Sequence, residues 1–366
     1  MQFIDLQTQY QKHKSQLDAA ISRVLTHGQF LFGPEIGLLE SRLAEYVGVK
    51  HCISMASGTT ALHIALMALN IQPGDEVITT PFSFFATAEV IYLLGAKPVY
   101  VDIDPITYLL DPTLLEAAIT AKTKAIIPVS LYGQCADMDA INQIAKRHKI
   151  PVIEDAAQSL GAVYKGKKSC ALSEIACTSF FPSKPLGGYG DSGACFTNDD
   201  ALAHRMRLIM NHGQKSRYHH VAIGMNGRMD TLQAAVLLEK LAIFNDELKA
   251  REVVANWYRD LLPDFLNAPV IASHNKSAYA QYTIQVDQRE QVQKKLSEAG
   301  IPTAVHYPIG LHQQPIVAEI SAEKRSFPIT EQCAKRVLSL PFHPYMTEEA
   351  VKQVCAALES CVVVRM

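Results

Sequence analysis

The stretch SFFPSKPLGGYGDSGACFTND, residues 179–199, places a single lysine between two apolar runs. Lys184 stands between Pro182 and Pro185, and the glycine-rich segment GGYG follows at residues 187–190. The prolines restrict the backbone around the lysine, and the glycines permit conformations and close packing that other residues resist. An amine held rigidly in a partly desolvated pocket has a lowered pKa and can attack carbonyl carbon. The stretch therefore predicts a reactive lysine, with an ordinary loop lysine as the alternative.

Seven apolar, β-branched runs occur before residue 200, and most are separated by segments of helical period. The runs are CISMAS (52–57), DEVITTPF (75–82), KPVYVDI (97–103), KAIIPVSL (124–131), IPVIEDAA (150–157), CTSFF (177–181) and GACFTN (193–198). Within residues 137–149, for example, Met138, Ile141 and Ile144 fall on one helical face. Apolar strands that alternate with helices predict an α/β fold with a mostly parallel seven-stranded sheet covered on both faces. Ligands of such sheets bind beyond the carboxyl ends of the strands.

The sequence pattern changes after residue 230. The segment 230–262 predicts one or two long helices, a strand-like run follows at 279–287, and a final helical segment begins near Thr347. We therefore expect a large ligand-binding domain at residues 1–240 and a smaller C-terminal α+β domain at 241–366. The first thirty residues are a candidate to pack beside the smaller domain.

Composition and charge exclude several classes of protein. The chain has 366 residues, of which 48% are hydrophobic and 19% charged, and its net charge is -2. This balance gives no electrostatic reason to expect nucleic acid or an anionic membrane surface as a partner. The N-terminus is too polar for a signal peptide, and no apolar run reaches the length of about 18 residues that a membrane span needs. The eight cysteines form no CxxC pair and several lie within apolar runs, which favours buried reduced thiols in a cytoplasmic protein. No cysteine or histidine spacing is typical of a metal site, so we expect no metal.

A carboxylate and an amide lie at the end of one apolar run. The run IPVIEDAA carries Asp155 near its end, and Gln158 lies three residues further on. A carboxylate at the end of a buried strand is costly unless a cation partners it. Asp155 is therefore a candidate for pairing with a cation, and a structural aspartate with local hydrogen bonds is the alternative with equal weight.

Two further segments offer binding groups at strand ends. The turn Ser57-Gly58-Thr59-Thr60 connects a strand to a helix, where free amides can bind an anion and glycine allows close approach. Many turns of this kind bind nothing. Phe82, Phe84 and Phe85 follow the next strand, where most aromatic side chains belong to the core, although one of them could stack on a flat ring.

In combination, these pieces match one cofactor. Pyridoxal phosphate needs a lysine for its aldehyde, an acid for its pyridinium nitrogen, a stacking partner and a cup for its phosphate. A non-enzymatic sensor or scaffold, and a Schiff-base lyase without cofactor, are the alternatives outside this class. The lyase would have no need of Asp155 or of the phosphate cup, and the sensor would have no need to keep Lys184.

The chain resembles the DegT/StrS family of nucleotide-sugar aminotransferases, which have the aspartate-aminotransferase fold (fold type I). The resemblance covers nearly the whole chain and rests on FGPEIGLLE, SGTTALHIAL, GDEVITTPFSFFAT, LGAKPVYVDID, VSLYGQCADMDAI, PVIEDAAQSLGA, SFFPSKPLGGYGDSG, GMNGRMDTLQAAVL and VHYP. It implies pyridoxal 5'-phosphate as the cofactor, in its pyridoxamine form during part of the turnover. It also implies a homodimer with shared active sites.

The resemblance also implies roles for particular residues. Those expected around the cofactor ring are Lys184 (bound to the aldehyde), Asp155 (pyridinium), Gln158 (phenolic oxygen) and Phe84 (stacking). Those expected at the phosphate are Gly58, Thr59, Ser179 and, from the neighbouring subunit, Asn226. Those expected at the sugar are Gly28, Phe30, Ser183, Arg228, His306 and Tyr307. Ser130 departs from the family pattern, because many relatives carry histidine there, and no role is assigned to it.

The resemblance extends to the substrates. The segments SFFPSKPLG and RYHH favour family members that transfer an amino group from L-glutamate to C3 of a UDP-linked 3-keto-N-acetylglucosaminuronic acid. That reaction serves the synthesis of O-antigen and related bacterial surface polysaccharide. Another nucleotide-linked keto sugar is the alternative. Sugar dehydratases of the same fold carry histidine at the lysine position, so Lys184 argues against dehydration.

Overall fold

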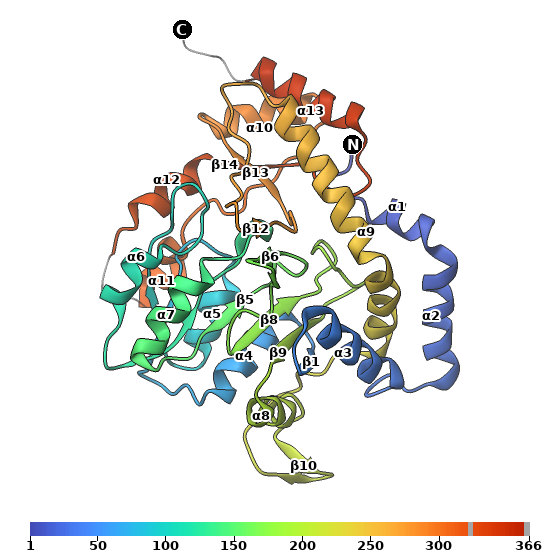
Figure 1. Ribbon diagram of the computed structural model, residues 1–366, viewed down its shortest axis with the longest axis vertical. Coiled ribbons are helices and arrows are strands. Elements are labelled where there is room, and N and C mark those ends of the chain that lie inside the picture. The colour runs from blue at the N-terminus through green and yellow to red at the C-terminus, as the bar shows by residue number, and fades with distance from the viewer. Residues whose placement is uncertain (321–324, 362–366) are drawn as a thin grey trace.

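A seven-stranded sheet forms the centre of the protein in the computed structural model, which describes residues 1–320 and 325–361 (Figure 1). The strand order is β1-β9-β8-β5-β4-β2-β3, with parallel bridges between β4 and β5 joining the two halves. The bounds are β1 His51–Met55, β2 Glu76–Thr79, β3 Lys97–Tyr100, β4 Thr123–Ile127, β5 Ile153–Asp155, β8 Ile175–Ser179 and β9 Gly193–Thr197. Only β9 runs antiparallel to its neighbours. The predicted sheet is confirmed, and each strand overlaps one of the seven predicted runs.

Helices cover both faces of this sheet, as its continuous apolar strands require. One face packs against α4 (Gly58–Ala68), α5 (Ala86–Leu93) and α8 (Asp200–Met210). The other packs against α3 (Pro34–Val47), α7 (Met138–His148) and the first half of α9 (Thr231–Leu261). Alternation along the strands directs neighbouring side chains to opposite faces of the sheet: Ile53 of β1 packs with the helices on the first face and its neighbour Cys52 with those on the second. The helix predicted at 137–149 is α7.

A second core lies beyond the sheet. The strands β13 (Tyr282–Gln285) and β14 (Val337–Leu340) pair antiparallel and pack with α10 (Arg289–Glu298), α13 (Glu348–Cys361) and the second half of α9. The segment 230–262 forms one continuous helix of 31 residues rather than two. The proposed domain boundary at residue 240 falls within this helix and stays a prediction. Figure 1 shows α9 running from beside the sheet to the smaller core.

The N-terminal segment lies along α9 and contacts both cores. Its helices are α1 (Leu6–Lys12) and α2 (Lys14–His27). Ala20 and Val24 of α2 pack against Ala235 in the first half of α9. Near the smaller core, the Phe342 amide donates a hydrogen bond of 3.1 Å to the carbonyl of Phe3. The segment therefore packs beside the large core as well as the small one.

Shorter elements complete the described chain. The helices are α6 Pro112–Leu115, α11 Pro315–Ile320 and α12 Pro328–Arg336, and the strands are β6 Val163–Tyr164, β7 Lys167–Lys168, β10 Gln214–Ser216, β11 His219–His220 and β12 Asn275–Lys276. Short 3-10 turns lie at Glu116–Ala118, Leu131–Gly133 and Leu311–Gln313. None of the helices in the described ranges is long and apolar enough to cross a bilayer.

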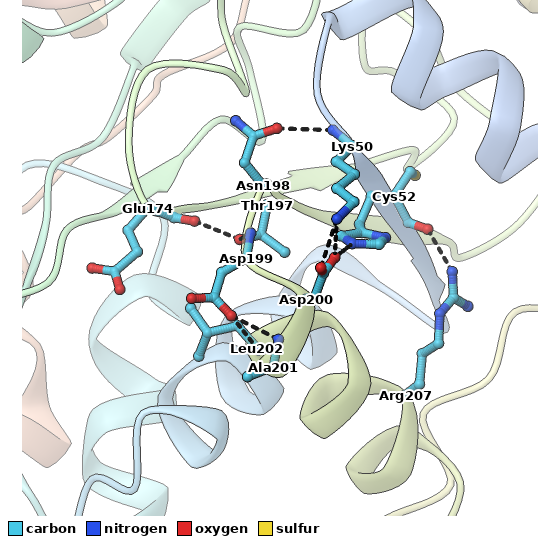
Figure 2. Close-up of polar contacts among 11 residues, drawn as sticks. Lys50, Cys52, Glu174, Thr197, Asn198, Asp199, Asp200, Ala201, Leu202 and Arg207 are labelled. Carbon is cyan, nitrogen blue, oxygen red and sulfur yellow. Dashed lines mark hydrogen bonds and ion pairs between the residues drawn. The ribbon is translucent and has the colours of Figure 1, made fainter.

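Polar contacts fix the start of α8 against β1 at the edge of the sheet (Figure 2). The Asp199 carboxylate accepts hydrogen bonds from the backbone amides of residues 201 and 202 at 2.7 and 2.9 Å, which satisfies two free donors of the first turn. Asp200 accepts from Lys50 and pairs with His51, each at 2.6 Å. These pairs are exposed and contribute little energy, so the cap contributes more to the start of this helix than the ion pairs do.

Candidate active site

A cavity of about 490 Å³ opens at the carboxyl ends of the parallel strands, where α/β folds bind their ligands. The predicted site residues that line it are Gly58, Thr59, Phe84, Asp155, Gln158, Ser179, Ser183, Lys184, His306 and Tyr307. Other lining residues that sequence reasoning did not identify as site residues include Ser83, Thr87, Asp191 and Gln281. Four predicted residues do not line it: Gly28, Phe30, Asn226 and Arg228.

Lys184 is held in the loop that follows β8. Its backbone amide donates to the carbonyl of Phe181 at 2.8 Å, and the Gly188 amide donates to Phe180 at 2.7 Å. A side chain at Gly187 would lie 2.4 Å from the carbonyl oxygen of Pro182, so the tight return of this loop requires glycine there. Burial lowers the pKa of the Lys184 amine to about 8, although the charge of Asp155 opposes this shift. A substantial fraction of the amine is therefore neutral near pH 8.

Asp155 ends β5 and faces Lys184 in the same cavity. The hydroxyl of Thr87 donates to its Oδ2 at 2.8 Å, and the Ala157 amide donates to Oδ1 at 3.2 Å. Burial raises the pKa of this carboxyl, while the two hydrogen bonds and the charge of Lys184 counteract the effect. Ser83 shares a hydrogen bond of 2.9 Å with Thr87 and so fixes that hydroxyl. Ser83 precedes α5 and Thr87 lies in its first turn, so no regular sequence pattern signals this support.

An amide and two aromatic rings form another part of the wall. Gln158 accepts a hydrogen bond from the Tyr132 amide at 2.8 Å and donates one to the Tyr307 hydroxyl at 3.2 Å. The ring of Phe84 lies 6.3 Å from that of Tyr307, centroid to centroid, and remains 57% exposed. Phe84 therefore presents a ring on which a flat ligand could stack.

His306 is a neutral group at this wall. Its Nδ1 lies 2.9 Å from the hydroxyl of Ser339. Burial lowers the pKa of His306 to about 4, and the positive charge of Lys184 adds to the shift. Near neutral pH the ring therefore offers hydrogen bonds but no charge.

The start of α4 forms a close-fitting edge of the cavity. The Ser57 hydroxyl accepts from the Thr60 amide at 3.0 Å, and the amides of Gly58 and Thr59 lie in the first turn, where a helix has no acceptors of its own. A Cβ at Gly58 would lie 2.7 Å from the Cβ of Ser179. Free amides, a helix N-terminus and an adjacent hydroxyl make a suitable cup for a phosphate.

The four predicted residues outside the cavity form two segments of the chain. Gly28 ends α2 with a positive φ of 67°, and the carbonyl of Phe30 accepts from the Thr231 amide at 2.9 Å. Asn226 is exposed, and Arg228 donates to the side chain of Asn211 at 2.8 Å. Arg228 thus binds an amide of its own chain rather than Asp230, and none of the four reaches the cavity of this subunit.

Ser130, for which the sequence suggests no role, hydrogen-bonds to a buried carboxyl. Its hydroxyl donates to Oε1 of Glu154 at 3.0 Å, on the face of β5 opposite Asp155. Glu154 also accepts from the Ser169 hydroxyl at 2.8 Å and from the Cys170 amide at 2.9 Å. Burial raises the pKa of Glu154, and these hydrogen bonds oppose the shift. Ser130 therefore supports a buried carboxyl next to Asp155 instead of contacting a ligand.

Comparisons with known proteins agree with this architecture. The model of the DegT/DnrJ/EryC1/StrS aminotransferase family matches residues 11–359. The chain is 60% identical to the UDP-2-acetamido-2-deoxy-3-oxo-D-glucuronate aminotransferase of Pseudomonas aeruginosa, over 98% of this chain and 99% of that protein. A DegT/DnrJ/EryC1/StrS aminotransferase from Brucella abortus superposes with a TM-score of 0.95 at 43% identity, covering 98% and 99% of the two chains. NtdA of Bacillus subtilis, solved with bound pyridoxamine phosphate, has a TM-score of 0.90 at 33% identity, covering 98% and 83%.

The chain belongs to the DegT/DnrJ/EryC1/StrS aminotransferase family. It is a fold type I aminotransferase, and its cofactor is pyridoxal phosphate, as the sequence predicted. The cavity fits this cofactor on its own chemistry: it combines a desolvated amine, a buried carboxyl and a turn of free amides too close to Ser179 for any side chain at Gly58.

The buried Glu154 leads to a pH-dependent prediction. Because its pKa is raised in the folded protein, Glu154 favours folding most at acid pH, and this contribution declines as pH rises above the ordinary glutamate pKa of about 4.3. Glu154→Gln cannot ionise, so the stability of this variant relative to wild type should increase as pH rises from about 4 to 7. Denaturant unfolding of the cofactor-free protein across this range measures the difference.

Glu40→Gln is the matched control for this series. Glu40 is also buried, but it pairs with Arg207 at 2.7 Å, so its substitution removes a charge that has a partner. That variant should be less stable than wild type at neutral pH. A Glu154→Gln difference that stays constant with pH would contradict the protonation argument.

Proposed function

We propose that this enzyme transfers the amino group of L-glutamate to C3 of a UDP-linked 3-keto-N-acetylglucosaminuronic acid. The product would enter the synthesis of bacterial surface polysaccharide such as O-antigen, in the cytoplasm. The observation that carries the proposal is the 60% identity, over almost the full length of both chains, to the Pseudomonas aeruginosa enzyme. The presence of Lys184 and Asp155 in one cavity supports transamination as the reaction.

The chain's own residues would hold the cofactor at three points. The amides of Gly58 and Thr59 and the hydroxyl of Ser179 would bind its phosphate, with Phe84 against the ring. Gln158, already fixed by Tyr132 and Tyr307, would approach the phenolic oxygen. Three points of contact fix a flat molecule in position and orientation, which is the protein's main task in cofactor chemistry.

Proton control would fall to Lys184 and Asp155. When bound, pyridoxal phosphate supplies an electron-withdrawing ring that stabilises negative charge at the carbon losing its proton. Asp155 would keep a proton on the ring nitrogen and so preserve that electron demand. Lys184 would take the proton from the donor's α-carbon and deliver it to the C4′ carbon of the cofactor, because its lowered pKa allows both directions near neutral pH.

Lys184→Ala tests the proposed reaction. The variant should still bind cofactor through the phosphate cup and Asp155, but turnover should fall by roughly 10²–10⁴-fold through loss of the proton-transferring group. Steady-state kinetics with L-glutamate and the UDP-linked keto sugar, with cofactor content measured by absorbance, provide the readout. Near-normal turnover in Lys184→Ala would refute the assignment.

We also propose that the enzyme is a homodimer with shared active sites, in which Asn226 contacts the phosphate of the neighbouring subunit's cofactor. Asn226 is exposed and does not line the cavity of its own chain. Exposed apolar side chains lie in the same segments of the sequence as the predicted residues outside the cavity: Phe30, Leu31 and Phe32 in one segment, and Val221 and Ile223 in the other. Such surfaces are typical of protein interfaces.

Mixed dimers test the shared site. Lys184→Ala and Asn226→Asp should each be inactive alone, the second because a carboxylate repels the phosphate. After subunit exchange, mixed dimers carry one site with neither lesion and should recover on the order of a quarter of wild-type activity. If exchange is demonstrated by mass spectrometry and no activity returns, Asn226 serves its own subunit or neither site.

We propose further that Arg228, with Gly28 and Phe30, enters the sugar site of the partner and binds the uronate carboxylate. Among the described residues that line the cavity, Lys184 is the only lysine or arginine, so a carboxylate needs a cation from elsewhere. Arg228 has one hydrogen bond to Asn211, and its buried Nε has no hydrogen-bond partner among the described residues. A guanidinium fork suits a carboxylate.

The substrate itself tests Arg228. A charge-assisted hydrogen bond is worth roughly 1.5–3 kcal/mol, so Arg228→Gln should lose about 10–150-fold in kcat/KM on the 3-keto uronate. For the same variant, kcat/KM on the matching neutral 3-keto hexose should fall much less. An equal loss on both sugars would show that Arg228 does not recognise the carboxylate, while leaving aminotransfer itself intact.

A further inference from the structure

A second, much smaller cavity lies behind the catalytic loop. Its volume is about 20 Å³, and three parts of the chain meet there with the loop of Lys184. Its walls are Ile4, Asp5, Leu6, Gln9, Pro182, Lys184, Pro185, Lys240, Glu247, Arg251, His343, Pro344 and Tyr345. Lys184 lines both this cavity and the active site. We call this space the rear cavity.

Helix α9 contributes three charged side chains to the rear cavity, Lys240 from its first half and Glu247 and Arg251 from its second half, and all three are buried. Glu247 accepts hydrogen bonds from the side-chain amide of Gln9 at 2.7 Å and from the Tyr345 hydroxyl. Arg251 donates to the carbonyl of Tyr279 at 3.0 Å. Two cations and one carboxylate of one helix therefore surround a space that also contacts Lys184.

Lys240 is the unusual member of this group. It is 2% exposed, and within the described chain it forms neither an ion pair nor a hydrogen bond. Its Nζ lies 5.1 Å from the ring centroid of Tyr189, in the glycine-rich part of the Lys184 loop. Burial lowers the pKa of Lys240 to about 8, with Glu247 opposing the shift. An amine buried in this way needs acceptors for its protons.

Three other polar atoms of the rear-cavity walls also have no partner in the described chain: Gln9 Oε1, Arg251 Nε and His343 Nδ1. Each belongs to a side chain more than nine-tenths buried. Buried polar atoms are normally hydrogen-bonded, and a water with two to four polar partners is the usual solution where side chains cannot meet. The rear cavity exceeds the volume of roughly 10–15 Å³ that one water needs.

We propose that the rear cavity binds an ordered water molecule that Lys240 shares with Gln9, Arg251 or His343, and that Lys240 acts through this water as a positioning residue for Lys184. The volume of about 20 Å³ suits one water. The inference rests on the role proposed for Lys184. It assigns the N-terminal segment and α9 a place in the active site's support, since both close the space directly behind the lysine.

The positioning role follows from the location of the water. Substrate and cofactor occupy the front of Lys184, so its loop must be supported from the rear. Pro182 and Pro185 contact the rear cavity, and a water hydrogen-bonded to Lys240 fills the space into which this loop could otherwise relax. Reaction rates depend steeply on such placement, because a shift of about 1 Å in a reacting group can cost on the order of 10²-fold.

A crystal structure of the wild-type holoenzyme tests the site directly. We expect an ordered water in the rear cavity, within hydrogen-bond distance of Lys240 Nζ and of at least one of Gln9 Oε1, Arg251 Nε and His343 Nδ1. In Lys240→Met this water should be lost. A dry rear cavity in wild type, at a resolution that shows other internal waters, would overturn the proposal, and so would a bound anion in its place.

Kinetics test the positioning role. Lys240→Met should lower kcat by about 10-fold with little change in KM for the keto sugar, because Lys240 touches neither substrate. Lys249→Met, an exposed position on the same helix, is the matched control and should leave both constants unchanged. Unchanged kcat in Lys240→Met would overturn the positioning role. The water test requires no turnover, so its outcome is independent of whether Lys184→Ala abolishes activity.

Discussion

The burial of an amine and a carboxyl in the same cavity is the constraint on which the rest of this structure depends. Desolvation favours the neutral form of both Lys184 and Asp155, and each group, when charged, partly restores the charge of the other. The charge states of the two groups therefore depend on the distance between them and on how much water reaches the cavity. Strand β5 fixes Asp155, the proline- and glycine-bounded loop fixes Lys184, and Thr87 provides the hydroxyl that completes the hydrogen bonding of the carboxylate.

The order of the strands explains why these groups meet. Asp155 ends β5 and Ser179 ends the neighbouring parallel strand β8, so the loop carrying Lys184 begins beside Asp155. The return strand β9 is antiparallel and brings the chain back beneath the turn that starts α4. Residues distant in the sequence thus contribute a carboxyl, an amine and free amides to one edge of the sheet, as is general for this fold class.

The sequence predicted the fold more completely than the site. The strands were predictable because continuous apolar runs are required where helices cover both faces, and Lys184 stood out by its prolines and glycines. The sequence did not reveal the role of Thr87 or of the serines that donate to Glu154, because serine and threonine are common on any helix or loop and only tertiary contacts make them partners. The roles proposed for Asn226 and Arg228 require a neighbouring subunit, whose position no local sequence pattern encodes. Helical period alone does not determine where a helix ends, so the sequence does not distinguish one long helix from two at residues 230–262.

The continuity of α9 has a mechanical consequence. Its first half is packed into the core beneath the sheet, and its second half into the core of β13 and β14. A helix without a break transmits rotation along its length, so it behaves as a lever rather than a hinge. If the smaller core swings toward the sheet when substrate binds, α9 must tilt as one body, and the charged side chains that it places at the rear cavity must move with it. Closure of the front of the active site and tightening of the space behind Lys184 would then be two ends of the same movement.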